Sequence, residues 1–296
     1  MSAAGSAAAA SIIKHIQGLG HSVIGIDANK NSESLAQLIC DEFYLSPLCH
    51  SGEFIPFINS LSDKFDLYIP FIDEELRCLA NSKLLLPEVI AKIILNSKEA
   101  IDDCTSKIKF QAFCQQHDLP VAEQTSSVPA IFKPEFGRGS KGVFIIEDEE
   151  LIPYFQKKIG VIQQLIIGME YTVDVLTNQQ GEWLFAVARK RIETAGVSRI
   201  GEIDQQENVL KLAKQCTEKF QFKGPVNIQI MLDDNNNAHL IEINPRLSGS
   251  LIFSTLAGFD IIDLAIKDKL KQSYQLPLEE NIINKRFVRY WQEHIC

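Results

Sequence analysis

The segment Leu240–Ser250, "LIEINPRLSGS", carries side chains that could bind a metal ion and a phosphate. Successive side chains of a β-strand point to opposite faces of the sheet. Glu242 and Asn244 should therefore share one face, while Ile241 and Ile243 share the other. A carboxylate beside an amide supplies the oxygen ligands that magnesium prefers. The alternative is an ordinary solvated strand face on which polar side chains pair with one another.

The end of this segment is suited to an anion. Pro245 cannot donate to a hydrogen-bond ladder, so the strand should end there and Arg246 should enter a loop. Ser248 and Gly249 follow, and they offer a hydroxyl and free backbone amides near the guanidinium. We therefore expect this loop to hold a phosphate or a carboxylate.

The residues before this segment predict a β-hairpin. The stretch "NIQIMLDDNNNAHLIEIN" has a polar turn between two runs of alternating character. If the loop has four residues, Asp233 pairs with Ala238, and that register carries Gln229 opposite Glu242. Directly opposed side chains lie about 5 Å apart on one face of a sheet.

The same register carries Asn227 opposite Asn244. One acid and three amides would then gather on one small patch. A slip of one residue would move Glu242 to the face of Ile228 and Ile230, and the apolar alternation argues against it. The predicted patch contains only one charged metal ligand.

A glycine-rich loop lies between two predicted strands in "KPEFGRGSKGV". Its residues are small or basic: Gly137, Arg138, Gly139, Ser140, Lys141 and Gly142. Backbone amides of such a loop can surround phosphate oxygens, although an ordinary hairpin turn has the same composition. Lys133 is more informative, because it lies in an apolar strand where a lysine is costly unless its charge is matched.

The composition is that of a globular protein with ample length for a core: 296 residues, of which 46% are hydrophobic. The 38 acids exceed the 29 bases, and the net charge of −9 argues against a dedicated nucleic-acid binder. The seven cysteines lack zinc or redox spacing, so we expect reduced thiols in a cytoplasmic protein. We expect no membrane span and no signal peptide, because neither pattern is present.

The first 96 residues alternate helices and strands as in an α/β domain with a parallel sheet. A small-residue loop at 3–10 should precede a helix at 11–19 and a strand at 22–27. Further strands are expected at 42–45, 67–71 and 93–95, and helices at 33–38, 53–61 and 74–81. The strand that should precede the Gly5 loop has no residues to form it. Either the real start lies upstream or that strand has been lost.

The pattern of residues 97–296 predicts an α+β fold. Residues 97–124 predict a helical connection that carries Lys107, and residues 125–167 predict a small unit with the glycine loop. Residues 168–296 predict antiparallel strands at 171–177, 183–190, 225–232 and 238–244, with a helix at 207–220. This last unit would carry the metal site.

Three segments, in matching order, resemble the ATP-grasp superfamily: "IFKPEFGRGSKGV", "VIQQLIIGMEYTVDV" and "GPVNIQIMLDDNNNAHLIEINPRLSGS". The chain is most similar to the carbamoyl-phosphate-synthetase-like branch of carboxylate–amine ligases. The Glu-x-Asn-Pro-Arg motif after an Asn-x-Gln strand is the specific feature. The resemblance implies an ATP-grasp fold with an N-terminal, Rossmann-like pre-ATP-grasp domain.

The resemblance also implies how ATP would bind. Lys107 and Lys133 would contact the phosphates, and the glycine loop would close over them. Glu170 would hold the ribose hydroxyls. The backbone of a hinge would contact adenine; its residues are Gln163, Gln164, Leu165 and Ile166. Many members have Asp where Ser106 precedes the first lysine, which weakens the likeness at that point.

The same resemblance assigns the reacting end of the site. Glu242 and Asn244 would ligate Mg²⁺ or Mn²⁺, with Gln229 as a further ligand where many branches have Asp. Arg246 would stabilise the transferring phosphoryl group or the substrate carboxylate. Lys133, Asn244 and Arg246 are thus the expected catalytic residues.

The implied reaction is ATP-dependent ligation of a small-molecule carboxylate to an amine or a thiol, through an acyl phosphate, with release of ADP and phosphate. One alternative is an ATP-grasp enzyme that phosphorylates a one-carbon or other carboxylate substrate. Another is a nucleotide-binding member without turnover. A homodimer is a further expectation from the resemblance.

Several residues are candidate substrate contacts. Asp73 and Glu74 follow a predicted strand at its carboxyl end, where open α/β sheets bind ligands, and either could grip an amine. Arg191 and Arg199 belong to the basic stretch "ARKRIETAGVSR" and could contact substrate or phosphate. Solvated or ion-paired side chains are the alternative for each.

Overall fold

The computed structural model describes residues 1–137, 139–195, 197–278 and 285–290. The helices are α1 Ala7–Gly18, α2 Glu33–Ile39, α3 Phe54–Ser60, α4 Asp73–Asn81, α5 Pro87–Lys92, α6 Lys98–Thr105, α7 Lys107–Gln116, α8 Ile152–Gln156, α9 Glu207–Phe220, α10 Ile252–Leu256 and α11 Ile261–Lys269. The strands are β1 Ile24–Asp27, β2 Glu42–Leu45, β3 Ala130–Pro134, β4 Phe144–Ile146, β5 Gly160–Gln164, β6 Gly168–Thr177, β7 Trp183–Ala195, β8 Val197–Ile203, β9 Pro225–Asp233, β10 Ala238–Asn244 and β11 Arg286–Val288.

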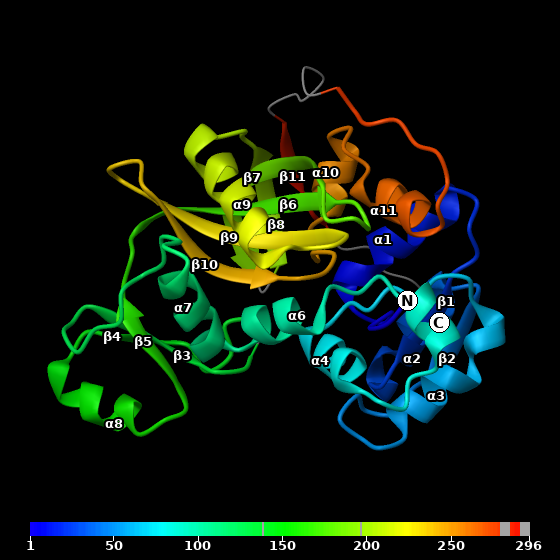
Figure 1. Cartoon of the computed structure of the whole chain (residues 1–296), viewed down its shortest axis with the longest axis horizontal. Helices are drawn as coiled ribbons and strands as arrows, with labels where there is room; N and C mark the ends of the chain where they lie inside the picture. Colours follow the sequence, from blue (N-terminus) through cyan, green and yellow to red (C-terminus); the bar gives the residue numbers. More distant parts are fainter. Residues whose placement is uncertain (138, 196, 279–284, 291–296) are drawn as a thin grey trace.

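The strands form three sheets. β1 and β2 pair in parallel, β4-β3-β5 is antiparallel, and β10-β9-β6-β7-β8-β11 is a six-stranded antiparallel sheet. In Figure 1 the six-stranded sheet lies above, the three-stranded sheet at the lower left and the N-terminal elements at the lower right. The helices α6 and α7 run beneath the large sheet and join the two lower groups. The α/β and α+β interpretation is confirmed.

The second half of the small-residue segment at the N-terminus is helical. Residues 7–10, predicted as loop, form the first turn of α1. The Ser6 hydroxyl accepts a hydrogen bond from the Ala9 amide and caps the helix. Alanine has the highest helix propensity, so a run of alanines continues a helix once it is capped.

The segment before α1 occupies the place of a first strand. Among the described residues no strand is formed before α1, as predicted. However, the Met1 amine donates to the Ile24 carbonyl, the Ile26 amide donates to the Met1 carbonyl, and the Ser2 amide donates to Ile69. Residues 1–4 therefore lie between β1 and residues 67–71. The predicted strands at 67–71 and 93–95 meet only through a parallel bridge between Tyr68 and Ile93.

One hydrophobic core joins the start of the chain to its end. Ile12 and Ile13 of α1 are fully buried together with Val187 of β7 and with Ile261 and Ile262 of α11. Neither α10 nor α11 was predicted from the sequence. Because this core is shared, the N-terminal elements are packed against the large sheet, and the predicted division at residue 96 stays a prediction.

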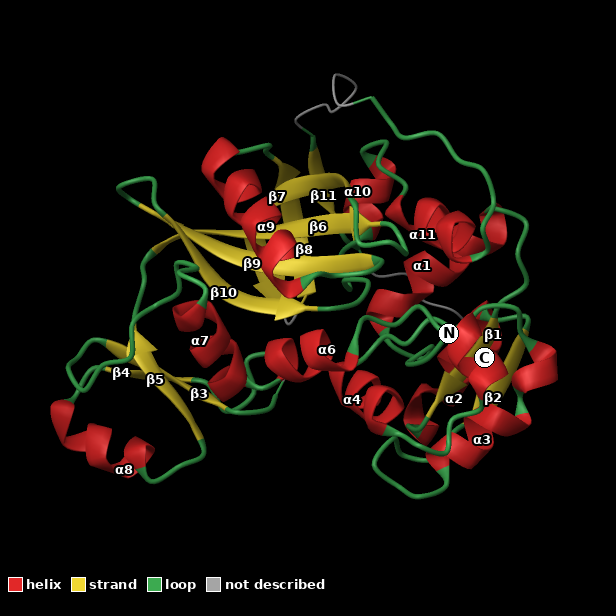
Figure 2. Cartoon of the chain, viewed as in Figure 1, coloured by secondary structure: helices red, strands yellow, loops and turns green. Residues whose placement is uncertain are grey.

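A second core covers the opposite face of the large sheet. Phe110 of α7 and Leu212 of α9 pack with Val173 of β6, Ile230 of β9 and Ile243 of β10. The predicted helix at 207–220 and the predicted helix around α7 are confirmed. Figure 2 shows α7 and α9 on this sheet.

The three-stranded sheet has a small core of its own. Phe132 of β3 and Ile146 of β4 pack with Ile152 and Phe155 of α8. The predicted order of strand, glycine loop and strand is confirmed here. Figure 2 shows this unit standing apart from the six-stranded sheet, so the segments around α7 and β6 connect the two.

Candidate active site

The β9–β10 hairpin brings the predicted polar side chains together. Glu242 pairs with Gln229 and Asn244 pairs with Asn227, as the alternation predicted. The side chain of Asn227 is buried, and its hydrogen bond to Asp174 fixes its position.

The turn of this hairpin differs from the prediction. Ala238 pairs with Leu232, one residue short of the predicted partner Asp233. A β-bulge between Leu240 and Glu242 takes up the difference and restores the predicted register beyond it.

The bulge also changes which side chains share a face. Ile241 lines the same cavity as Glu242, whereas Ile243 lies in the core beside α9. The prediction that Ile241 and Ile243 share a face is therefore wrong, because the extra residue shifts the alternation by one.

Glu242 lies between two amides and two arginines. The Gln229 Nε2 and the Asn244 Nδ2 both donate to Glu242 Oε1, over 2.6 and 3.2 Å. On the far side, Arg191 Nη1 donates to Gln229 Oε1 at 3.0 Å and Arg246 Nη2 donates to Asn244 Oδ1 at 3.2 Å. The arrangement is nearly symmetric about the carboxylate.

Each arginine is held in turn by an acid. Arg191 Nη1 donates to Glu170 Oε1 at 2.7 Å. Arg246 donates through Nε and Nη2 to the two carboxylate oxygens of Asp73, at 2.7 and 3.1 Å. Glu170, Arg191, Gln229, Glu242, Asn244, Arg246 and Asp73 thus form one unbroken row, which we call the polar row.

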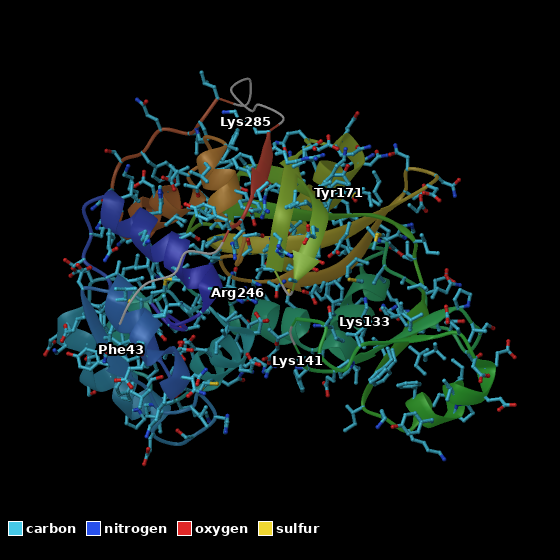
Figure 3. The ribbon with its side chains drawn as sticks, turned by 180° about the vertical axis from the view of Figure 1, so that it is seen from behind. Phe43, Lys133, Lys141, Tyr171, Arg246 and Lys285 are labelled. Carbon is cyan, nitrogen blue, oxygen red and sulfur yellow. The ribbon has the colours of Figure 1, made fainter. Side chains whose placement is uncertain are left out.

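Two lysines add positive charge beside the polar row. Lys107 Nζ lies 3.5 Å from Glu242 Oε2. Lys133 is only 9% exposed, and burial lowers its pKa to about 8, against the opposing effect of Glu242 and Glu170. Burial also raises the pKa of Glu170, and Arg191 counteracts that shift. Figure 3 labels Lys133, Lys141 and Arg246, which follow one another across the view.

Two cavities meet at the polar row. A cavity of about 920 Å³ lies between the N-terminal elements and the large sheet. A cavity of about 290 Å³ lies between the large sheet and the three-stranded sheet. The residues that line both are Gly139, Lys141, Arg191, Gln229 and Glu242. The two cavities therefore share the wall that these side chains form.

The smaller cavity contains most of the predicted ATP contacts: Lys107, Lys133, Gly137, Gly139, Ser140, Lys141, Gln164, Leu165, Ile166 and Glu170. Gln163 does not line this cavity, and its buried side chain donates to the Ala122 carbonyl. Gly139 and Gly142 adopt φ of 59° and 77°, which glycine accepts without strain. Arg138 lies outside the described residues.

The larger cavity contains several predicted substrate contacts. Glu74, Arg246, Ser248 and Gly249 line it. Asp73 does not lie open to an amine, because both its oxygens accept from Arg246. Arg199 is paired with Glu193 at 2.7 Å on the strands β7 and β8, where both side chains are about half exposed.

A buried ion pair supports the loop after β10, and sequence reasoning missed it. Arg189 is fully buried and donates to Asp174 Oδ2 through Nη2 at 2.6 Å. The hydroxyls of Ser248 and Ser254 also donate to Asp174. An acid inside the apolar run "YTVDV" was the available signal, because a buried carboxylate requires a cationic partner.

The centre of the polar row offers few ligands to a metal ion. Within the described ranges, no group of three or more His, Cys, Asp or Glu could hold one. Glu242 provides one carboxylate, and Asn244 and Gln229 each have one amide-oxygen lone pair beyond the arginine contact. This set fits a magnesium ion that takes most of its ligands from phosphate and water.

No helix in the described part of the chain is long and apolar enough to cross a membrane.

Comparisons with known proteins find similarity to one family. Residues 157–289 match a family model described as "ATP-grasp in the biosynthetic pathway with Ter operon". The chain is 23% identical over 306 residues to the carbamoyl phosphate synthase large chain of Pseudothermotoga lettingae, covering 92% of this chain and 26% of that one. It is 25% identical over 214 residues to the arginine-specific large chain of Halalkalibacterium halodurans, covering 61% and 20%. The chain thus spans about a fifth to a quarter of the length of these relatives.

Solved structures show the same fold. N5-carboxyaminoimidazole synthetase of Staphylococcus aureus has a TM-score of 0.71 at 18% identity, covering 92% of this chain and 76% of that one. L-amino acid ligase of Bacillus licheniformis has a TM-score of 0.67 at 20% identity, covering 93% and 73%. The biotin carboxylase domain dimer of Hydrogenobacter thermophilus 2-oxoglutarate carboxylase, solved with MgADP, ADP and bicarbonate, has a TM-score of 0.70 at 14% identity, covering 93% and 70%.

Proposed function

Because the chain belongs to the ATP-grasp superfamily, in its carbamoyl-phosphate-synthase-like branch, we propose that it is an ATP-dependent ligase that joins a carboxylate to an amine. The observation that carries this proposal is the polar row at the junction of the two cavities. Such a junction lets ATP in one cavity meet a carboxylate in the other.

The smaller cavity is the proposed ATP site. Gln163–Ile166 would contact adenine through their backbone, and Glu170 would hold the ribose. Lys107, Lys133 and the glycine loop would surround the phosphates. The low exposure of Lys133 supports this role, because a buried ammonium gains most from a polyanion.

The larger cavity is the proposed place of the carboxylate. Arg246, Ser248 and Gly249 line it next to the polar row. The carboxylate would attack the γ-phosphate and break the bond to the β-phosphate, which yields an acyl phosphate and ADP. No base is needed for this step, because the carboxylate is already ionised. The cationic side chains would neutralise the charge on the transferring group.

The amine would then attack the acyl carbon and release phosphate, forming an amide. Glu74, which lines the larger cavity, is the proposed contact for the amine. A thiol acceptor would give a thioester by the same course.

Glu242 and Asn244, with the remaining lone pair of Gln229, would hold magnesium or manganese near the phosphates. When bound, this ion neutralises phosphate charge and fixes the geometry of in-line transfer. We also propose that the protein is a homodimer in the cytoplasm. The dimer of a structurally similar carboxylase domain supports the homodimer.

Release of ADP tests the proposal directly. The purified chain is incubated with ATP and magnesium while amino acids and small acids are screened in pairs. We expect ADP release that depends on one carboxylate and one amine, together with an amide product of the summed mass less water. If ATP binds and no pair releases ADP, the protein is not a ligase of this kind.

A further inference from the structure

We propose that Arg191 is a second phosphate-contacting arginine of the reaction, equivalent to Arg246 on the other side of Glu242. The proposal rests on the ligase function above. It assigns a definite partner to a residue that the sequence left among several candidate contacts.

The side chain of Arg191 lies at the junction of the two cavities. It lines both cavities, whereas Arg246 lines only the larger one among those described. Its side chain, 13% exposed, extends from β7 toward the junction and is held by Glu170 and Gln229. A guanidinium there faces the end of a nucleotide that occupies the smaller cavity and points toward the larger one.

The polar row is nearly symmetric about Glu242. On each side of Glu242 an amide donates to the same carboxylate oxygen and accepts from an arginine. Each arginine is anchored by an acid beyond it. The two guanidiniums are therefore held by equivalent supports, one toward the nucleotide and one toward the substrate.

Arg191 retains N–H donors that could bind a further acceptor. A guanidinium has five N–H donors. The two hydrogen bonds found for Arg191 both come from Nη1, and its buried Nε has no partner among the described residues. A guanidinium that is held only through Nη1 keeps donors for a further acceptor. Phosphate oxygens match such donors, because arginine binds them in a bidentate manner.

The orientation of Gln229 supports this assignment. Its oxygen faces Arg191 and its nitrogen faces Glu242. Reversing the amide would set donor against donor and acceptor against acceptor, so the neighbours fix the orientation. Gln229 therefore aligns Arg191 with Glu242, and at most one lone pair of its oxygen is left for a metal ion.

Nucleotide binding to the intact chain tests the proposal without requiring the ligase substrates. Calorimetric titrations with a non-hydrolysable ATP analogue, ADP and AMP, each with magnesium, are compared for the wild type and Arg191→Gln. We expect the variant to bind the triphosphate about tenfold or more weakly, the loss expected for charge-assisted hydrogen bonds. Binding of AMP should change by less than about twofold, since AMP lacks the phosphates at the junction.

Arg286→Gln is the matched control. Arg286 is an arginine of the same sheet, on β11, whose exposed side chain pairs with Glu202 at 3.2 Å, and all three affinities should stay at the wild-type values. Arg191→Lys keeps the charge without the fork of donors, so it should fall between the wild type and Arg191→Gln. If circular dichroism shows that Arg191→Gln does not fold, Arg191→Lys tests the proposal instead. Its ratio of triphosphate to AMP affinity should then be lower than that of the wild type.

Two results would overturn the proposal. One is unchanged triphosphate binding in the folded variant. The other is an equal loss for all three nucleotides, which would make Arg191 a structural support of Glu170. A wild type that binds no nucleotide would refute the ligase function itself, whereas normal nucleotide binding with unaffected variants refutes only the role of Arg191.

Discussion

Arg246 donates two parallel hydrogen bonds to Asp73, a residue 173 positions away that begins α4. The side chains are 14% and 15% exposed. The arginine of the Glu-x-Asn-Pro-Arg motif is therefore aligned by the N-terminal part of the chain, and the pair joins α4 to the loop after β10. A bidentate pair at this depth fixes direction as well as distance.

Asp73→Asn should disturb both stability and turnover. The amide oxygen can accept one hydrogen bond from Arg246, but the amide nitrogen would face a second donor and the neutral amide cannot balance the charge. The free energy of unfolding should therefore fall by about 1–3 kcal/mol. Turnover should fall more than nucleotide affinity, because Arg246 is proposed to act on the transferring group. Chemical unfolding and ADP release measure the two effects.

The matched control for Asp73→Asn is Glu42→Gln, which removes one partner of the half-exposed pair with Lys64. That change should leave unfolding and turnover unaffected, since such pairs contribute little. Equal effects of the two substitutions would show that Asp73 has no special relation to Arg246.

Glu242→Ala should abolish magnesium-dependent turnover while the fold is retained. The carboxylate is 28% exposed and is the one acid beside the two amides, so its loss removes the charged metal ligand. We expect ADP release to fall by about 100-fold or more. Binding of Mn²⁺ in the presence of a non-hydrolysable ATP analogue, followed by electron paramagnetic resonance, should weaken in parallel. Glu193→Ala, at the exposed pair with Arg199, should change neither.

Nucleotide affinity should decrease as pH rises through about 8. Burial lowers the pKa of Lys133 to about 8, so the free protein loses this positive charge above that pH. Phosphates bind the charged form, so binding above pH 8 should be accompanied by uptake of one proton. Calorimetry in buffers of different ionisation enthalpy measures that uptake.

Lys133→Arg should remove this pH dependence between pH 7 and 9.5, because a guanidinium stays protonated there. Lys157→Arg, on the same unit but exposed, should leave it intact. A wild type whose affinity is flat across this range would place Lys133 away from the phosphates.

Glu75→Gln should stabilise the protein at pH 8 and have little effect at pH 5. Glu75 is 1% exposed and accepts hydrogen bonds from the hydroxyls of Ser2 and Tyr68. Burial raises its pKa to about 7, above the usual range, so the folded state holds this proton more tightly than the unfolded state. The stability that the proton provides is present at low pH and is lost as pH rises toward and through 7, by roughly 3 kcal/mol.

The glutamine cannot ionise, so the variant should not show this loss. Thermal unfolding of both proteins between pH 5 and 8 provides the comparison. Parallel curves for the two proteins would contradict the assignment of a neutral Glu75 in the folded state.

Local patterns were sufficient for much of the fold and for the centre of the site. The hairpin register that pairs Gln229 with Glu242 follows from the alternation of apolar residues, because a one-residue slip would bury the acid. The helix α9 follows from its amphipathic period, and the glycine loop from its composition. The family likeness follows from motifs contained in single short segments.

Other features depended on residues that meet only in space. The bulge at Ile241 could not be read from the turn sequence, because the offset of one residue is corrected within the strand. The place of residues 1–4 beside β1 and the core shared by α1 and α11 are likewise long-range. The partners of Asp73, Arg189 and Arg191 lie on other elements.

Strand period and motif spacing are local properties of the backbone, so they predict which chemical groups the site contains. How those groups are paired depends on the packing of distant elements. The guanidinium of Arg246 is oriented by an acid from α4. Glu242 is flanked by two arginines, each held by an acid, and does not lie on an isolated polar strand. Long-range pairing follows from how the sheets and helices pack, and no single segment contains that information.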